Sequence, residues 1–134
     1  MRRILIDSSF YVALIYSQDV NHLKAQKMVN RFPPDEYTQL TTEDFLKETL
    51  TVLSQRVDKE ASIEFYNALV TNTQIVSVTP TQFQQGLSLF LTPRLNKDIS
   101  LIDCIASVIY HDIGAHALVT FDAHFKTLRL DTLP

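Results

Sequence analysis

The sequence predicts an α/β fold with three layers, α/β/α, in which helices cover both faces of a mostly parallel central sheet of about five strands. Short apolar runs of strand length alternate with longer segments of helical periodicity along all 134 residues. Two of these runs, "ILI" near the start and "ALV" near the end, are apolar throughout, as parallel strands buried on both faces usually are. No linker or internal repeat interrupts the alternation, so we expect one domain over residues 1–134.

The first half of the chain supplies six expected elements, each bounded by a polar turn or by proline. They are strands over residues 3–7 and 37–42, and helices over residues 9–16, 20–32, 42–57 and 61–70. Pro33 and Pro34 end the helix over 20–32, because proline cannot continue a helix. The helix over 42–57 has the clearest pattern, since its apolar residues form one broad stripe at helical spacing.

The second half continues the same alternation. We expect strands over residues 74–78 and 115–121, helices over 81–91 and 100–114, and a turn or short helix over 122–130 that leads to a final strand. Pro80 and Pro93 mark the ends of the first strand and the first helix of this half. Gly114 stands just past the end of the second helix, the position that favours glycine.

Cysteine, glycine and histidine exclude several kinds of site. Cys104 is the only cysteine, so there is no internal disulfide, and we expect a small buried side chain in a reducing compartment. With glycine only at Gly86 and Gly114, the glycine-rich loops that bind nucleotide phosphates are absent. The spacing of the histidines is not that of metal ligands; they are His22, His111, His116 and His124.

Charge and hydropathy favour a cytoplasmic protein. The apolar run behind Arg2 and Arg3 is too short for the core of a signal peptide, and no stretch approaches the roughly 18 apolar residues of a membrane span. The net charge of −3 creates no general attraction for nucleic acid. A polyanionic partner would therefore have to meet bound cations or a local basic patch.

Two aspartates follow the two most strand-like segments. Asp7 ends "ILID" and Asp122 ends "LVTFD", and parallel strands would bring both to the edge of the sheet where ligands bind in such folds. Aspartate is also among the best residues for capping a helix, and a helical turn is expected after each. For either residue alone, a chemical role and a capping role both remain open.

A third acid, Asp103, lies near the start of the helix over 100–114. Ser100 and Asp103 match the capping box that opens a helix. Asp103 also falls with Ser107 and Tyr110 on the one polar strip that we assign to an otherwise apolar helix. In a mostly buried helix such a carboxylate is expected to line a polar crevice.

The helix over 42–57 carries three further acids. Glu43 and Asp44 fall in its first turn, where negative charge favours the helix dipole, and we interpret them as structural. Glu48 lies on the flank of the apolar stripe. An exposed glutamate that pairs with Lys47 or Arg56 is the ordinary expectation at such a position, and a place in a site is the alternative.

Several carboxylates at one edge of a sheet need compensating charge. Carboxylates that lie close together raise one another's pKa, and a divalent cation removes the conflict. Oxygen ligands without an accompanying cysteine or histidine cluster favour Mg²⁺ or Mn²⁺ over zinc or copper. The sequence therefore predicts a Mg²⁺ or Mn²⁺ site if the acids meet.

Four segments together resemble a known family. In order, "LIDSSFYVAL", "EDFLKETLTVL", "SLIDCIASVI" and "ALVTFDAHF" resemble the four acidic motifs of PIN-domain ribonucleases, in particular VapC-like toxins of toxin and antitoxin pairs. The resemblance spans essentially the whole chain and implies a PIN-like fold. The catalytic and metal-binding acids that it implies are Asp7, Glu48, Asp103 and Asp122. It selects Glu48 over Glu43, and it gives Ser8 and Thr120 supporting roles as small hydroxyl residues near the site.

The resemblance also implies a function and partners. The function is Mg²⁺-dependent hydrolysis of RNA phosphodiester bonds by an endoribonuclease that acts as the toxin of a pair. The implied partners are the RNA substrate, a cognate antitoxin protein and a second copy of the chain. Residues that could contribute to a dimer interface are Leu87, Leu89, Phe90 and Leu91, although packing within the domain is the more ordinary fate of such side chains.

A basic rim around the acids is the feature of this sequence that RNA binding would need. Candidates for that rim are Arg2, Arg3, Lys47, Arg94, Lys97, Lys126 and Arg129. Lysine and arginine are usually just solvated surface residues. The sequence alone does not show which of these side chains surround the acids.

Two other functions remain open. A non-catalytic RNA-binding or scaffold protein with the same fold would use its acids as helix caps. A phosphoacceptor domain would phosphorylate Asp7 with the help of Mg²⁺. One family of that kind needs a further acid where this chain has Ser9, and receiver domains need an acidic pair and a late lysine that are not evident here.

Overall fold

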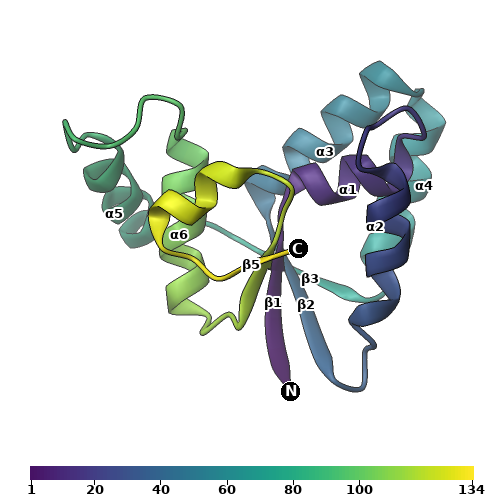
Figure 1. The fold of residues 1–134 in the computed structure, drawn as a ribbon, viewed down its shortest axis with the longest axis horizontal. Coiled ribbons are helices and arrows are strands. Elements are labelled where there is room, and N and C mark those ends of the chain that lie inside the picture. Colours follow the sequence, from purple (N-terminus) through teal and green to yellow (C-terminus); the bar gives the residue numbers. More distant parts are fainter.

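The computed structural model describes all 134 residues and contains a five-stranded sheet with the strand order β3-β2-β1-β4-β5. The strands are β1 (Arg2–Ile6), β2 (Tyr37–Thr42), β3 (Thr73–Val76), β4 (Ala117–Val119) and β5 (Thr132–Leu133). All neighbouring strands pair in parallel, and β1 lies at the centre between β2 and β4. Helices flank the sheet on both sides (Figure 1). The predicted three-layer α/β/α fold is confirmed, with a sheet that is parallel throughout.

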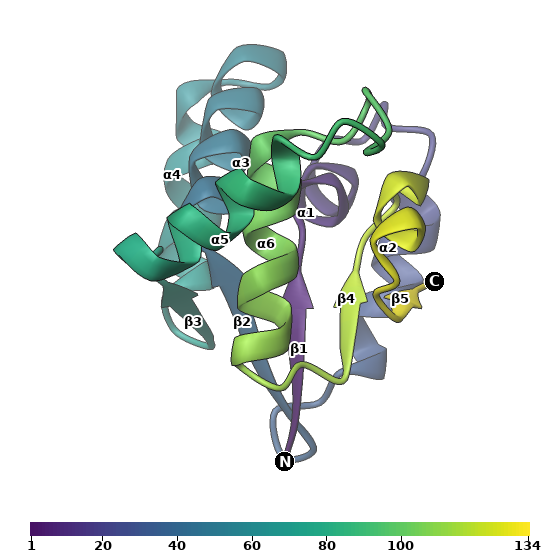
Figure 2. The ribbon, with the colours of Figure 1, turned by 90° about the vertical axis from the view of Figure 1, so that its left-hand side faces the viewer.

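The helices divide into two groups, one on each side of the sheet (Figures 1 and 2). One group contains α1 (Ser8–Ile15), α2 (His22–Met28), the 3₁₀ helix η1 (Val29–Arg31), α3 (Glu43–Arg56) and α4 (Lys59–Leu69). The other contains α5 (Pro80–Phe90), α6 (Leu101–Asp112) and the 3₁₀ helix η2 (Ala123–Leu128). Every predicted element is present, with ends close to the predicted ones, and the helix predicted over 20–32 divides into α2 and η1.

The helix boundaries follow from capping residues. The Thr42 side chain accepts a hydrogen bond from the amide of Phe45 at 3.0 Å and so caps α3. Capping boxes formed by Thr79 with Gln82, and by Ser100 with Asp103, open α5 and α6. These side chains satisfy amides that the first turn of a helix leaves without partners. The predicted starts of these three helices lie within one residue of the observed ones, although the Thr79 box was not recognised in the sequence.

The buried centre of the sheet explains the apolar run in the first strand. Ile4 and Ile6 belong to the apolar cluster beneath α1, α2 and α4, whereas Leu5 belongs to the cluster beneath α6. Successive side chains of a strand point to opposite faces, so both faces of β1 are covered. Burial on both faces fixes β1 firmly, and with it the position of the residue that follows.

Close packing between α5 and α6 depends on Gly86. A Cβ atom at this position would lie 2.5 Å from the Ile105 side chain and 2.9 Å from the Ile105 Cα. The approach of the two helices is therefore closer than any larger residue allows. Because Ile105 lies two residues after Asp103, this contact helps to set the position of the start of α6.

One expectation about polar residues is wrong. Ser107 and Tyr110 do not line a polar strip with Asp103, because both are buried and Tyr110 is part of the apolar cluster beneath α6. The serine and tyrosine side chains are small or amphipathic enough to pack in the interior.

The helices of this fold are also short. None of them combines the length and the apolar character that a membrane span requires.

Candidate active site

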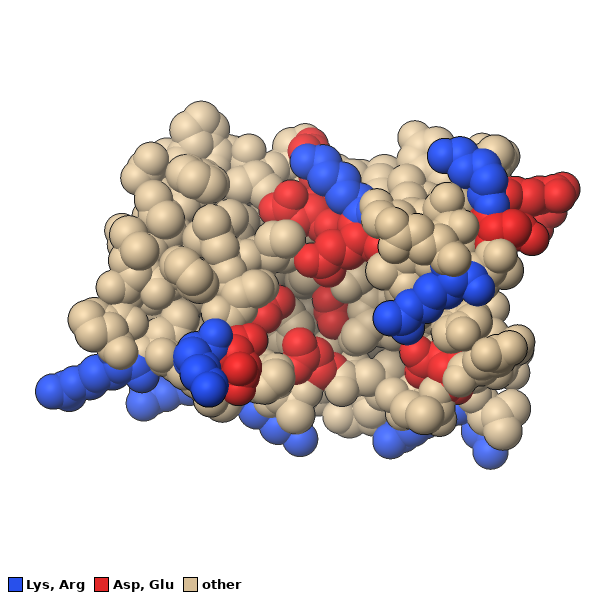
Figure 3. Space-filling view, turned by 90° about the horizontal axis from the view of Figure 1, so that it is seen from above, with Lys and Arg blue, Asp and Glu red and all other residues tan.

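Acidic side chains gather at the edge of the sheet where the strands end. The amide of Asp7 donates a hydrogen bond to the Val119 carbonyl at 3.0 Å, so the ends of β1 and β4 lie side by side. Seen from this edge, Asp and Glu side chains occupy a hollow between the two groups of helices (Figure 3). Asp7 and Asp122, which follow these two strands, therefore lie at the same edge of the sheet.

Asp7 is the most buried of these acids, with only 4% of its surface exposed. Its Oδ2 accepts hydrogen bonds from the Ser9 hydroxyl at 2.6 Å and from the Thr120 hydroxyl at 2.7 Å. Burial raises the pKa of Asp7, and the bonds from Ser9 and Thr120 offset part of that rise. The Asp7 side chain makes no capping hydrogen bond to α1. Asp7 therefore stands at the N-cap position of α1 without a side-chain capping bond.

Glu48 is half-buried and reaches the Asp7 carboxylate through Ser8. The Ser8 hydroxyl donates to Glu48 Oε2 at 2.7 Å and also lies 3.2 Å from Asp7 Oδ1. Burial raises the pKa of Glu48, and the charges of Asp7 and Asp103 raise it further. Glu48 makes no ion pair, because the nearby Lys47 contacts Asp44 at 3.8 Å instead. The expectation of an exposed, salt-bridged glutamate is therefore wrong.

Asp103 serves as a helix cap and also faces the other acids. Its amide donates to the Ser100 hydroxyl at 3.0 Å, and its Oδ2 accepts from the Ser100 amide at 3.1 Å. Burial raises the pKa of Asp103, and the charges of Asp122 and Asp7 raise it further. The capping box and a place beside the other acids are thus compatible.

Asp122 is partly exposed, with about a third of its side chain accessible (34%). Its Oδ1 accepts a hydrogen bond from the His124 amide at 2.9 Å, which caps η2. The same oxygen lies 2.8 Å from the His124 ring nitrogen Nδ1. Sequence reasoning missed this histidine, whose only signal is its place two residues after a strand-end acid.

Ser9 is a second residue that sequence reasoning missed at this edge. Its hydroxyl donates to Asp7 and accepts a hydrogen bond from the Phe121 amide at 3.0 Å. Thr120 acts in parallel, because its hydroxyl donates to Asp7 and accepts from the Asp122 amide at 2.9 Å. Two hydroxyl groups therefore tie the end of β1 to the chain after β4. The available signal was the second serine of "DSS".

The donor set has the chemistry of a site for a hard cation. Asp7, Glu48 and Asp103 offer only oxygen, and none of them pairs with a lysine, arginine or histidine. No three acidic, histidine or cysteine side chains lie close enough together in this structure to hold a metal ion. Binding an ion would therefore require side-chain movement or water between ion and carboxylate, which suits Mg²⁺ because it usually keeps several waters.

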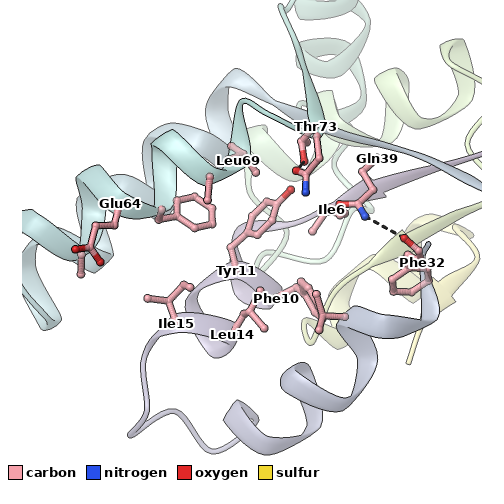
Figure 4. Close-up of a pocket in the computed structure, with 15 residues that line it drawn as sticks. Ile6, Phe10, Tyr11, Leu14, Ile15, Phe32, Gln39, Glu64, Leu69 and Thr73 are labelled. Carbon is pink, nitrogen blue, oxygen red and sulfur yellow. Dashed lines mark hydrogen bonds between the residues drawn. The ribbon is translucent and has the colours of Figure 1, made fainter. Parts of the chain in front are cut away.

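Two hollows adjoin α1, and only one of them contains acids of the site. The α3 groove, with a volume of about 690 Å³, is lined by Ser8, Glu48 and Asp122 and continues along α3. A separate pocket of about 310 Å³ is lined mainly by apolar residues around Tyr11, with Glu64 as its only charged side chain (Figure 4). The apolar pocket contains none of the predicted site residues, so the α3 groove is the candidate approach to the acids.

Comparisons with known proteins support the fold. The family model that describes the PIN domain matches residues 4–129. VapC20 from Mycobacterium tuberculosis, a toxin that cleaves the sarcin-ricin loop, has a similar structure, with a TM-score of 0.84 and 22% identity over 95% of both chains. VapBC-1 from nontypeable Haemophilus influenzae matches 98% of this chain and 96% of its own, with a TM-score of 0.69 and 12% identity.

A third similar structure is VapBC2 from Rickettsia felis, solved bound to a DNA fragment from its promoter. It matches 98% of this chain and 97% of its own, with a TM-score of 0.67 and 13% identity. At these identities the likeness concerns the fold. No curated protein matches the sequence.

Proposed function

The chain belongs to the PIN-domain family, and on that premise we propose that it is a divalent-metal-dependent endoribonuclease formed by one nuclease domain over residues 1–134. One observation carries the proposal. The carboxylates of Asp7, Glu48 and Asp103 have no cationic partner, and burial raises the pKa of each of them. Such an arrangement costs stability unless a bound cation compensates for it.

The residues that would hold Mg²⁺ or Mn²⁺ are Asp7, Glu48, Asp103 and Asp122. When bound, the ion supplies positive charge for the scissile phosphate and lowers the pKa of a bound water. Ser9 and Thr120 hold the Asp7 carboxylate in one orientation through Oδ2. Ser8 positions Glu48 through Oε2. Glu48 and Asp122 line the α3 groove, and the proposed base that accepts a proton from the attacking water is one of these two carboxylates.

The test is cleavage of labelled RNA by the purified protein. We expect cleavage with Mg²⁺ or Mn²⁺, none after addition of a chelator, and none by the Asp7→Asn variant. Asp58→Asn is the matched control, because Asp58 caps the distant helix α4. Cleavage that persists in both the chelator and the Asp7→Asn variant would contradict the proposal, as would a wild-type protein without activity.

A non-catalytic RNA-binding or scaffold protein is the second candidate function. It is favoured by the capping bonds of Asp103 and Asp122, and by the absence of three acids close enough to share an ion. It predicts a wild-type protein that binds RNA without cleaving it. The phosphoacceptor alternative has less support, because two hydroxyls already occupy Asp7 Oδ2; it predicts a stable label on Asp7 after incubation with a phosphodonor.

We further propose that the protein is the cytoplasmic toxin of a toxin and antitoxin pair. The support is the likeness to chains from such pairs, which include a toxin-antitoxin complex from Klebsiella pneumoniae with a TM-score of 0.64. A short gene beside this one should encode the antitoxin. Co-purification of its product with this chain, and loss of RNA cleavage in the complex, are the expected results. Full cleavage by the complex would contradict this role.

A homodimer formed through α5 is the remaining proposal about partners. Phe90 and Leu91 at the end of α5 are exposed by 40% and 65%, whereas Leu87 and Leu89 are partly buried. We expect light scattering to give the mass of a dimer and Leu91→Glu to give a monomer. Val20→Glu, which places the same charge at another exposed apolar position, should leave the dimer intact. A wild-type monomer would contradict the proposal.

A further inference from the structure

The apolar pocket of about 310 Å³ between α1 and α4 has no part in the proposed nuclease site. Ile15 and Val29 line it and are exposed by 37% and 41%, so the pocket opens to solvent beside them. A cavity of about 150 Å³ with apolar walls is enough to bind benzene, so this pocket has room for a molecule of about two rings. Its floor consists of buried apolar side chains, which are Ile6, Phe10, Tyr11, Phe32, Phe65 and Leu69.

Tyr11 brings an unpaired polar group to this pocket. Only 4% of its surface is exposed, and its hydroxyl makes no hydrogen bond. The nearby Thr41 and Thr73 hydroxyls donate to other groups, to a backbone carbonyl at 2.8 Å and to Asn72 at 3.0 Å. Burial raises the pKa of Tyr11, so its hydroxyl keeps the proton that it could donate. A buried donor without an acceptor is unfavourable, and a ligand that supplies an acceptor removes that cost.

The polar groups of the pocket gather at one end. The Tyr11 hydroxyl is directed toward Thr73, and Gln39, which pairs with Thr73 across β2 and β3, lies at the same end (Figure 4). Gln39 donates through its amide nitrogen to the Phe32 carbonyl at 3.2 Å, which leaves its side-chain oxygen free. A few polar groups at one end of an apolar pocket fix the orientation of a small ligand. An apolar side chain inserted by a partner protein would leave Tyr11 unpaired.

Glu64 gives the other end of the pocket a negative charge (Figure 4). It is exposed, makes no ion pair and is the only charged residue of the lining. Because no lysine or arginine lines the pocket, an anionic ligand would find no partner there and would be repelled by Glu64. The charge of the pocket therefore disfavours carboxylates and phosphates.

We propose that this pocket binds an uncharged small molecule with an apolar body of about two rings and a head group whose oxygen accepts a hydrogen bond from Tyr11. The body would lie on the floor, where the Tyr11 and Phe65 rings meet edge to face with centroids 5.1 Å apart. The Tyr11 hydroxyl is closed to water, so a small displacement of its ring would bring it to the head group. The site is separate from the acids and does not depend on nuclease activity.

Three probes that share an indole ring and differ only in the substituent at one carbon test this proposal. Indoleacetamide carries an uncharged acceptor, methylindole has no head group, and indoleacetate is an anion. Titrations of the isotope-labelled protein followed by NMR report on the amides of the pocket residues. We expect indoleacetamide to bind saturably with a Kd of about 1 mM or tighter. Methylindole should bind about three- to tenfold more weakly, and indoleacetate about tenfold more weakly.

Variants of Tyr11 identify the group that donates to the ligand. Tyr11→Phe should weaken the binding of indoleacetamide about three- to tenfold and leave that of methylindole unchanged. The unfolding temperature of this variant should not fall, because the hydroxyl makes no bond in the free protein. Tyr66→Phe is the matched control, since it removes a partly exposed hydroxyl from α4 outside the pocket.

A second pair of variants tests the charge of the pocket. Glu64→Gln should strengthen the binding of indoleacetate about threefold and leave that of indoleacetamide unchanged. Glu60→Gln removes an exposed carboxylate of α4 that does not line the pocket, and should change neither.

Three results would overturn the proposal. They are the absence of saturable shifts at the pocket amides, equal affinity of wild type and Tyr11→Phe for indoleacetamide, and binding of indoleacetate as tight as that of indoleacetamide. Protection of the pocket by a co-purified protein chain, with no binding of any probe, would assign it to a partner and overturn the proposal too. RNA cleavage by Tyr11→Phe should equal that of the wild-type protein, so the nuclease proposal is decided separately.

Discussion

The ends of β1 and β4 present the same sequence pattern in two different environments. In each, an apolar strand is followed by an aspartate, Asp7 or Asp122, at the same edge of the sheet. Asp7 is buried and its side chain makes no capping hydrogen bond, whereas Asp122 is partly exposed and its side chain caps η2. The pattern therefore predicts where an aspartate lies, and the surrounding structure decides whether that aspartate stabilises a helix end.

The difference indicates that Asp7, unlike Asp122, lowers the stability of the folded protein without capping a helix through its side chain. The bond from the His124 amide gives Asp122 a structural role. Asp7 lies in a low-dielectric position where its charge is unfavourable, and hydroxyl groups, not cations, surround it. Residues that lower stability in this way are typical of active sites. We therefore regard Asp7 as the centre of the proposed site.

The largest expected effect is that of Asp7→Asn on activity. We expect RNA cleavage to fall by more than about a hundredfold, beyond the 10- to 100-fold typical for groups that only support a metal ligand. Stability should stay equal or rise, because the amide has the size of the carboxylate and carries no buried charge. Cleavage rates and urea unfolding measure the two effects. If the Asp7→Asn variant were less stable than the wild-type protein and fully active, Asp7 would be a structural residue and not the centre of the site.

The hydroxyl groups that tie the two strand ends together should have the next largest effect. We expect Ser9→Ala and Thr120→Ala each to lower activity and Mn²⁺ affinity by about 10- to 100-fold. Each should also reduce the free energy of unfolding by about 1–3 kcal/mol, because the buried carboxylate loses a donor. Titration of Mn²⁺ followed by electron paramagnetic resonance, together with urea unfolding, checks both effects.

Conservative variants sharpen this test. Thr120→Ser keeps the hydroxyl and should recover most of the lost Mn²⁺ affinity. Ser88→Ala removes an exposed hydroxyl from α5 and should change neither property. If Thr120→Ala matches the wild-type protein, then the hydroxyl bonds to Asp7 do not organise the site.

The pH dependence of stability should differ between wild type and Asp7→Asn. Burial raises the pKa of Asp7 above its ordinary value of 3.8, so the folded protein binds this proton more tightly than the unfolded chain does. Its contribution to stability is therefore complete below pH 3.8 and is lost as pH rises through the raised pKa. The raised pKa values of Glu48 and Asp103 act in the same direction. Without divalent ions, the Asp7→Asn variant should lose less stability over this range.

Urea unfolding at several pH values, with a chelator present, measures this effect. Mg²⁺ should oppose the loss at neutral pH, because metal binding requires ionised carboxylates. The same pH profile for both proteins would show that Asp7 does not titrate as its burial predicts.

The smallest expected effect is on the cap that Asp122 provides. We expect Asp122→Ala to reduce the free energy of unfolding by about 1 kcal/mol, and Asp122→Ser to reduce it less, because serine also caps helices well. Both variants should lose RNA cleavage, since neither keeps a carboxylate. Thermal unfolding and the cleavage assay together separate capping from chemistry. An Asp122→Ser variant with full activity would leave Asp122 with the structural role alone.

The sequence by itself determined the order of the elements and the edge of the sheet at which the acids meet. Local signals were sufficient for this, because apolar periodicity and caps such as Thr42 and Ser100 depend on neighbours along the chain. The strand-end position of Asp7 followed from the parallel pairing that alternating strands and helices require. Glu48 was preferred to Glu43 through the family resemblance, since helical spacing alone did not show that Glu48 belongs to a site.

Only the tertiary structure decided the environment of each acid. Ser9 meets Thr120 and the Phe121 amide across 111 and 112 residues of sequence, and no local pattern reports such a contact. The same holds for the bond from Ser8 to Glu48, and for the burial of Ser107 and Tyr110 that corrected the predicted polar strip. Burial and electrostatic coupling depend on which surfaces fold together. A sequence can therefore place a carboxylate at an edge, but its pKa and partners are set by residues that only the fold brings near.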